Sequence, residues 1–176
     1  METAAVSGRD RDRVVPASAL PQEQWSAFGE FYRVEYPRMV RVALLVTGSL
    51  ETAQDVVQES SVGVWRRWGQ LRDPSGYLYR SVVNGCRSHH RRAAREERLH
   101  ALSGGLWPVA SGAPAPATEL LDALASLPYR QRAALVLRFY DDLSEADTAR
   151  VLGCRPGTVG SLVHRGLAQL KKVIEL

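Results

Sequence analysis

Side chains that could bind nucleic acid recur at helical spacing near the C-terminus. A helix is predicted to begin at Pro156. The candidate DNA-binding side chains on its outward face and in the turn before it are Arg155, Thr158, Ser161, His164 and Arg165. In a helix-turn-helix, the first residues of the second helix reach base edges in the major groove, and flanking cations bind phosphate. The pattern indicates a reader of duplex DNA. A pair of antiparallel helices without nucleic acid is the alternative on pattern alone.

Carboxylates recur every four residues in the first half of the chain. Glu51, Asp55 and Glu59, with Gln58 beside them, would form one edge of a helix opposite its apolar face. Like charges at this spacing cost helix stability. The pattern is typical of a solvated helix face or, alternatively, of an edge that docks a basic partner.

Aromatic residues precede a basic segment after residue 76. Tyr77 and Tyr79 come first. The polar and basic residues that follow are Arg80, Asn84, Arg87, Arg91 and Arg92. Aromatic rings stack on unpaired bases and arginines follow the phosphate backbone. The segment therefore indicates a site for single-stranded nucleic acid, although each tyrosine taken alone is expected to be half-buried core.

No combination of residues predicts an enzyme. The four histidines lack an organised partner pattern of Cys, Ser or carboxylate, and no glycine motif that would cradle a phosphate is present. Cys86 and Cys154 are far apart and have no second Cys or His at ligand spacing. We expect no cofactor, no metal site and no disulfide framework.

The acidic edge and the basic segment require helices to position them. Apolar residues recur at steps of three and four from Trp25, with Pro37 in the middle of the pattern. Ser49 is a plausible N-cap for a helix that runs to about Trp68. A turn-rich segment from residue 69 to 76 follows, and another helix opens near Ser75.

The predicted DNA reader is built from two further helices. Ser144 and Asp147 have the spacing of a capping box, Gly153 ends that helix, and Pro156 suits the first turn of the next one. An earlier helix follows Pro128 and is expected to carry an apolar face of Ala133, Ala134, Leu137 and Tyr140. The buried side of the last helix is expected to be Val159, Leu162, Val163, Gly166, Leu167 and Leu170.

These elements predict an all-α fold, because no segment of useful length shows the period-two alternation of a strand. We expect a disordered tail over residues 1–24, a helical domain over 25–98, a flexible Gly/Pro-rich linker over 99–117 and a helix-turn-helix domain over 118–176. The linker would allow the two domains to sit apart.

The 176 residues carry a net charge of +4, which permits an anionic partner without requiring one. The longest uncharged stretch is broken by Gly and Pro, and the N-terminus lacks the layout of a secretion signal. We therefore expect a soluble cytoplasmic protein that does not insert into membranes.

Taken in order, these segments resemble a bacterial extracytoplasmic-function sigma factor. The resemblance covers residues 28–172 and rests on AQDVVQESSVGVWRRW, then YLYRSVVNGCRSHHRR, then LPYRQRAALVLRFYDDLSEADTARVLGCRPGTVGSLVHRGLAQLKK. Several long motifs in this order are far more specific than a single helix-turn-helix. The resemblance implies an initiation factor that binds core RNA polymerase, through its largest and second-largest subunits, and directs it to promoter DNA.

The resemblance also implies a role for each surface. The acidic helix would dock on a coiled coil of the largest polymerase subunit, through Asp55, Gln58, Glu59 and Trp65. The unpaired minus-ten element would be held by Leu71, Arg72, Tyr77, Arg80, Asn84, Arg87, Arg91 and Arg92. The helix from Pro156 would read the minus-35 element. Many relatives are held by an anti-sigma protein, which nothing in these residues identifies.

The chain departs from the family pattern in the last helix. Relatives commonly have Lys, Ser and Arg where this chain has Gly160, Ser161 and Leu162, and Gly166 stands where Ala is common. Two missing cations and two glycines are expected to weaken minus-35 binding. Gln54 replaces a common Glu, which is expected to soften docking only slightly.

Two other function classes remain open at this point. A helix-turn-helix regulator that binds duplex DNA without polymerase would leave the acidic helix and the aromatic segment unexplained. A recombinase or nuclease with this DNA-binding tail is disfavoured, because the first half offers no clustered carboxylates or nucleophile for phosphodiester chemistry.

Overall fold

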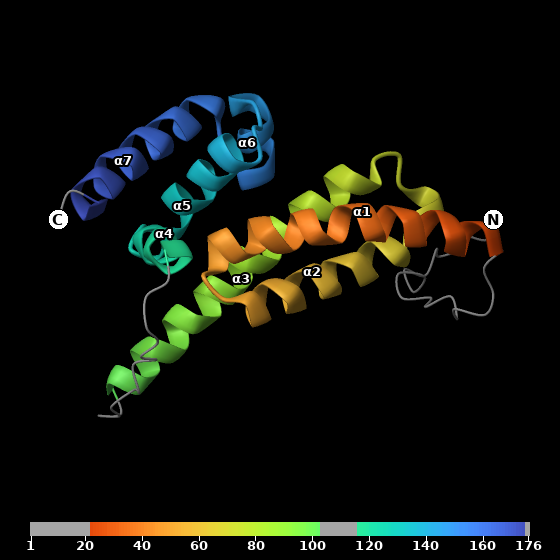
Figure 1. Cartoon of the computed structure of the whole chain (residues 1–176), viewed down its shortest axis with the longest axis horizontal. Coiled ribbons are helices and arrows are strands. Elements are labelled where there is room, and N and C mark those ends of the chain that lie inside the picture. Colours follow the sequence, from red (N-terminus) through yellow and green to blue (C-terminus); the bar gives the residue numbers. More distant parts are fainter. Residues whose placement is uncertain (1–21, 103–115, 175–176) are drawn as a thin grey trace, which may run out of the picture.

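The computed structural model describes residues 22–102 and 116–174, and every regular element in these ranges is helical (Figure 1). The elements are α1 (Gln22–Thr47), α2 (Leu50–Trp65), the 3₁₀ turn η2 (Trp68–Gln70), α3 (Pro74–Leu102), α4 (Pro116–Ala125), α5 (Tyr129–Leu135), the π-helical turn η3 (Val136–Tyr140), α6 (Glu145–Leu152) and α7 (Pro156–Ile174). The all-α prediction is confirmed for this part of the chain.

Helices α1, α2 and α3 form the first unit. Their buried sides meet in a core that includes Met39 and Val42 from α1, Val57 from α2 and Leu78 from α3. Ser49 caps α2 as predicted, because its Oγ accepts a hydrogen bond from the Thr52 N–H at 3.3 Å. The C-terminal part of α3 projects past the other two helices (Figure 1).

Several predicted boundaries differ from the structure. Helix α1 starts at Gln22 and continues through Pro37, and α2 ends at Trp65, with η2 placing Trp68 in a separate turn. Helices α3 and α4 both reach into the segment expected to be a linker, since α3 continues to Leu102 and α4 begins at Pro116. Most of the predicted tail and linker lies outside the described residues.

Helices α4 to α7 form the second unit. Leu137 and Val159 are fully buried in its core, with Ala133 and Ala134 beside them. Tyr140 was expected on the same apolar face and is instead 47 % exposed. The reason is the π-helical turn η3, whose i→i+5 hydrogen bonds place more residues in each turn and so rotate Tyr140 out of the α-helical register.

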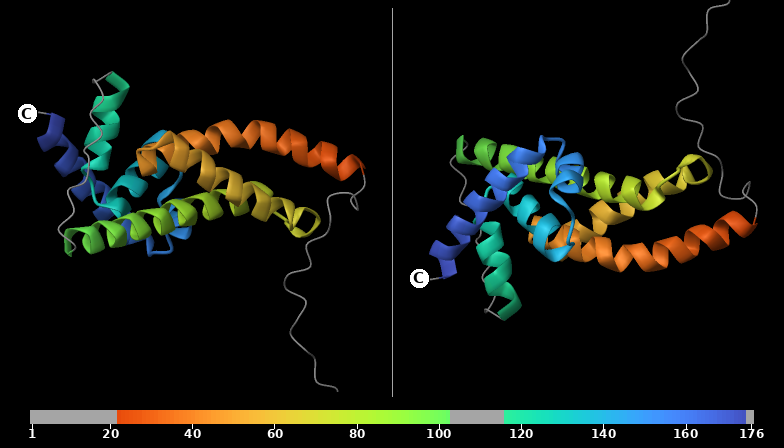
Figure 2. Two further views of the ribbon diagram at one scale, coloured as in Figure 1. Left: turned by 90° about the horizontal axis from the view of Figure 1, so that it is seen from below. Right: turned by 90° about the horizontal axis from the view of Figure 1, so that it is seen from above.

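The two units are in contact, although the sequence predicted only that they could sit apart. The second unit lies against the C-terminal end of α1 and against α3 (Figures 1 and 2). Side chains separated by up to 103 residues in sequence are hydrogen-bonded across this contact. Nothing in the local periodicity signals these pairs.

The described residues bear on the sequence-based expectations for membrane spans, metal sites and cysteines. None of the described helices is both long enough and apolar enough to cross a membrane. Within residues 22–102 and 116–174, no cluster of three or more His, Cys, Asp or Glu side chains could hold a metal ion. Burial raises the pKa of the Cys86 thiol to about 12, so this cysteine is a protonated core residue.

Candidate nucleic-acid interface

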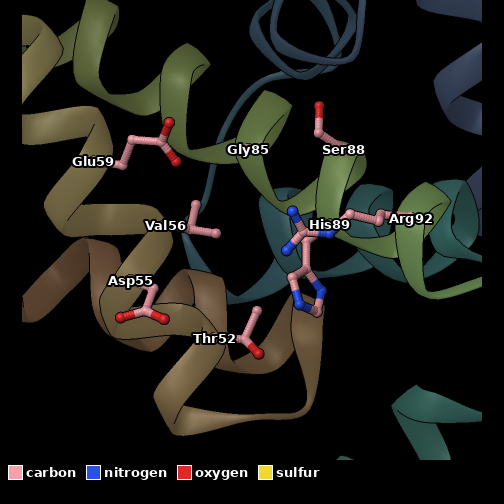
Figure 3. Close-up of a pocket in the computed structure, with 8 residues that line it drawn as sticks. All are labelled: Thr52, Asp55, Val56, Glu59, Gly85, Ser88, His89 and Arg92. Carbon is pink, nitrogen blue, oxygen red and sulfur yellow. The ribbon is translucent and has the colours of Figure 1, made fainter. Parts of the chain in front are cut away.

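Asp55 and Glu59 stand at the edge of an open groove between α2 and α3 (Figure 3). His89 and Arg92 line the opposite side, on α3, and the hollow has a volume of about 310 Å³. Close packing of the two helices forms its floor: a Cβ on Gly85 would lie 2.7 Å from Val56 Cγ1. The groove thus has one acidic and one basic wall.

The two carboxylates of this groove are exposed and have no cation within ion-pair distance in the described part of the chain. Gln58 is exposed on the same helix. An unpaired carboxylate edge next to a groove can accept hydrogen bonds from a basic partner surface. The exposure of these three side chains is compatible with docking, which stays a prediction.

Trp65 lies elsewhere. Its ring packs 4.1 Å from Trp25 and 4.8 Å from Phe28, measured between ring centroids, in an aromatic cluster between α1 and the end of α2. The structure therefore does not bring Trp65 to the acidic groove. Its side chain is half-buried and helps to fix α1 on α2.

One stripe of α3 carries most of the residues predicted to bind the unpaired strand. Arg80, Asn84, Arg87 and Arg91 follow one another at steps of four, three and four, and all four are exposed. Arg92 lies on another side of the helix, in the acidic groove, where its Nε is 3.8 Å from Glu96 Oε1. That exposed pair contributes little to stability.

The predicted strand-binding residues around the start of α3 differ in their exposure to solvent. Arg72 is exposed, Leu71 packs against the core, and Tyr77 is half-buried with the Arg67 guanidinium 5.6 Å from its ring centroid. Tyr79 is only 6 % exposed, as expected of a core residue.

Asp73 was not singled out from the sequence, yet it sets the start of α3. Its Oδ1 accepts a hydrogen bond from the Gly76 N–H at 2.8 Å, and Pro74 occupies the first helical position. The Asp-Pro-Ser-Gly order is a recognisable start signal. Asp73 therefore determines where the stripe on α3 begins.

The helix-turn-helix is built as predicted. Ser144 Oγ accepts a hydrogen bond from the Asp147 N–H at 3.0 Å at the start of α6. Gly153 ends α6 with φ of 60°, a left-handed conformation that favours glycine. Helix α7 then begins at Pro156.

The exposed face of α7 and the turn before it carry four of the five side chains predicted to read duplex DNA. Arg155, Ser161, His164 and Arg165 are exposed, and Thr158 is partly buried. A shallow hollow of about 570 Å³ is lined by Ser161, His164 and Arg165 together with Gly160. The Arg165 Nε–H donates to the Ser161 carbonyl at 3.1 Å, which holds the guanidinium along the helix.

The inward side of α7 corrects three expectations. Leu167 was predicted to be buried and is 46 % exposed, whereas Leu162 is 6 % exposed. A cation at position 162 would therefore point into the core, so only Gly160 marks a missing cation on the DNA face. At Gly166 a Cβ would lie 2.8 Å from Leu135 Cδ1, so this glycine permits the close packing of α7 on α5.

Comparison with known families matches both units. Residues 31–96 match Sigma-70 region 2, and residues 117–170 match Sigma-70 region 4. The first match contains the acidic groove and the stripe on α3. The second contains the helix-turn-helix.

Individual relatives match most of the chain. The ECF RNA polymerase sigma factor SigM of Mycobacterium tuberculosis is 34% identical over 153 residues, which is 84% of this chain and 77% of the relative. The RNA polymerase sigma-E factor of Streptomyces avermitilis is 31% identical over 84% of this chain and 85% of the relative.

Solved structures show the same fold. The sigma factor RpoE in complex with the anti-sigma factor NepR from Bartonella quintana aligns with a TM-score of 0.71 at 22% identity, over 86% of this chain and 98% of that one. CnrH in complex with the cytosolic domain of CnrY aligns with a TM-score of 0.61 at 23% identity, over 86% and 89%. With both regions present in order and a 34% identical relative matched over most of its length, this chain belongs to the ECF RNA polymerase sigma factors.

Proposed function

We propose that this sigma factor works through three separate surfaces, one for core RNA polymerase and two for promoter DNA. The unpaired carboxylates of Asp55 and Glu59 at the open groove carry the proposal for polymerase docking. A basic surface on the polymerase would provide their missing partners. Gln58 adds a neutral hydrogen-bonding group beside them.

The second and third surfaces divide the promoter between the two units. The stripe of Arg80, Asn84, Arg87 and Arg91 on α3 would take the unpaired minus-ten strand, with Arg72 and Tyr77 at its start. The exposed face of α7 would enter the major groove at the minus-35 element. The proposed domains are residues 25–98 and 118–176, with 99–117 between them.

We further propose that the protein acts stoichiometrically, without bond-making chemistry, in the cytoplasm where the polymerase works. Binding energy from strand capture would offset the few kcal/mol needed to unstack the promoter. The proposal includes an anti-sigma partner, because RpoE was solved in complex with the anti-sigma factor NepR. Absence of plasmid nicking in the presence of Mg²⁺ would support the non-enzymatic role.

Charge reversal tests the docking surface. The variant Asp55→Lys/Glu59→Lys should weaken binding to core polymerase by about thirtyfold or more, because lost charge pairs at an interface cost about 2 kcal/mol or more. Fluorescence anisotropy with labelled protein measures this. The control Glu23→Lys/Glu30→Lys makes the same charge change at exposed positions of α1. Equal affinity of the two variants, with unchanged circular dichroism, would refute the docking assignment.

A further inference from the structure

A carboxylate from α6 stands beside the exposed face of α7. Glu145 is the first residue of α6, and its side chain is exposed to solvent. A Cβ built on Gly160 of α7 would lie 3.6 Å from Glu145 Oε1, which is ordinary van der Waals contact. Because Gly160 has no side chain, the Glu145 carboxylate lies next to the space that a side chain at this position of α7 would enter.

The surroundings of this carboxylate belong to the face of α7 that is proposed to enter the major groove. Gly160 lines the hollow on α7 together with Ser161, His164 and Arg165. The first turns of the second helix in a helix-turn-helix contact base edges. Helix α7 begins at Pro156, so Gly160 lies in its second turn. A polar group beside Gly160 is therefore placed where bases are read.

Glu145 differs from the other carboxylate in the first turn of α6. Asp147 forms an ion pair with Arg150, and its N–H donates to Ser144 Oγ. Within residues 22–102 and 116–174, no cation lies within ion-pair distance of Glu145. A negative charge in the first turn stabilises a helix, which is the simplest role for Glu145. That role leaves the carboxylate oxygens available to a ligand.

The four bases differ in what they offer to a carboxylate in the major groove. Guanine presents two acceptors, adenine presents an acceptor beside its amino group, and thymine presents an acceptor and a methyl group. Cytosine alone presents an amino donor, N4, without an acceptor on the same edge. An ionised carboxylate can only accept hydrogen bonds, so it should favour cytosine over the other three bases.

We propose that Glu145 is a specificity-determining residue of the minus-35 surface and accepts a hydrogen bond from the N4 amino group of a cytosine. One position of the minus-35 element read by this protein would therefore be a cytosine. The same negative charge would repel phosphates and lower the affinity for duplexes that lack this cytosine. The inference rests on the proposed function of α7.

Base selection by the assembled holoenzyme tests the inference. The full chain is combined with core RNA polymerase, and bound duplexes from a random library are sequenced. Wild-type protein should enrich cytosine about tenfold at one position of the upstream element, as expected for one good base contact. Glu145→Gln should replace this cytosine by adenine, because a glutamine amide pairs with adenine N6 and N7. The control Glu119→Gln makes the same change at an exposed position of α4 and should keep cytosine.

Deleting the amino group of the base alone gives a sharper test. In the selected duplex, the cytosine is replaced by 2-pyrimidinone, which lacks the N4 amine. The replacement should weaken holoenzyme binding about tenfold for the wild type and much less for Glu145→Ala, because both deletions remove the same contact. Equal losses for the two proteins would overturn the inference.

The remaining outcomes separate this inference from the function on which it rests. The same selected bases for the wild type and Glu145→Gln would limit Glu145 to stabilising the start of α6. Equal tightening of Glu145→Gln on every duplex would show phosphate repulsion alone. Either result would overturn base reading by Glu145 while leaving α7 as the reader. No base preference in the upstream element of the wild type would overturn the minus-35 assignment and this inference together.

Discussion

The two surfaces proposed to read DNA differ in what lies in front of them. The stripe on α3 faces α6 and α5 of the second unit across narrow crevices, whereas the exposed face of α7 is open. Both carry exposed arginine side chains, so composition alone would treat them alike. The difference shows that placement in the folded chain, and not residue type, decides which surface is available first.

The difference also has a mechanical basis. Helix α7 packs closely on α5 at Gly166 and buries Val159, which leaves its polar side outward. On α3 the inner side packs on α1 and α2, and three residues of the exposed stripe, Arg80, Asn84 and Arg87, line crevices beside the second unit. Removing, loosening or recharging the second unit should therefore change the two surfaces in different ways.

Removing a buried side chain from the second unit should give the largest difference between the two units. Leu137 is fully buried, so Leu137→Ala should destabilise that unit by about 2–5 kcal/mol. Hydrogen exchange read by mass spectrometry should become faster over residues 129–170 and change less over 22–102. Leu120→Ala, at a side chain 52 % exposed, is the matched control. Uniform loss of protection in both units would contradict an effect concentrated in the second unit.

Substituting two glycines of α7 by alanine should change the free energy of unfolding by smaller amounts and in opposite directions. A Cβ at Gly166 would lie 2.8 Å from Leu135 Cδ1, so Gly166→Ala should cost about 1–3 kcal/mol. Gly160→Ala meets only ordinary contact with Glu145 and should stabilise α7 by about 0.5–1 kcal/mol. Urea denaturation measures both. Stabilisation by Gly166→Ala would show that α7 is not held so closely.

Adding a cation to the exposed face of α7 should change duplex DNA binding by this face alone. Gly160→Lys should tighten binding to duplex DNA, and the slope of log affinity against log salt should steepen by about 0.9 for one added phosphate contact. Ala125→Lys, on the exposed side of α4, controls for net charge. Identical salt slopes for the two variants would place position 160 outside the DNA contact.

Acidification should produce the smallest effect, a weakening of the contact between the two units. Burial, Arg132 and His89 lower the pKa of His90 below its ordinary value of 6.5. A base with a lowered pKa takes up protons more readily when the two units separate, so the contact between the units weakens as the pH falls through 6.5. Scattering between pH 8 and 5.5 should show expansion, which His90→Phe should reduce. An equal response in that variant would assign the effect to other groups.

Local features of the fold were predictable because they depend on neighbours in sequence. Ser49, Ser144, Gly153 and Pro156 mark helix ends by their own chemistry, and the structure places them where that chemistry requires. The same reasoning assigned the acidic edge of Asp55 and Glu59 to an exposed side of α2.

Other features depend on residues far apart and could not be predicted in this way. The π-helical turn η3 moved Tyr140 to the surface, and Gly166 proved to be a packing requirement that spacing alone does not reveal. The Arg38–Asp141 pair spans 103 residues, so no local pattern contains it. The roles of Trp65 in docking and of Arg92 in strand binding were implied by the family resemblance, which does not show that Trp65 packs on Trp25 or that Arg92 lines the acidic groove.

Specific initiation is the most direct test of the account. Core RNA polymerase without any sigma factor would be incubated with fragmented bacterial DNA, nucleotides and this protein, and the 5′ ends of the transcripts would be mapped by sequencing. The account predicts a discrete set of start sites that appears only with the protein and disappears with Asp55→Lys/Glu59→Lys. The same start sites with and without the protein would contradict it.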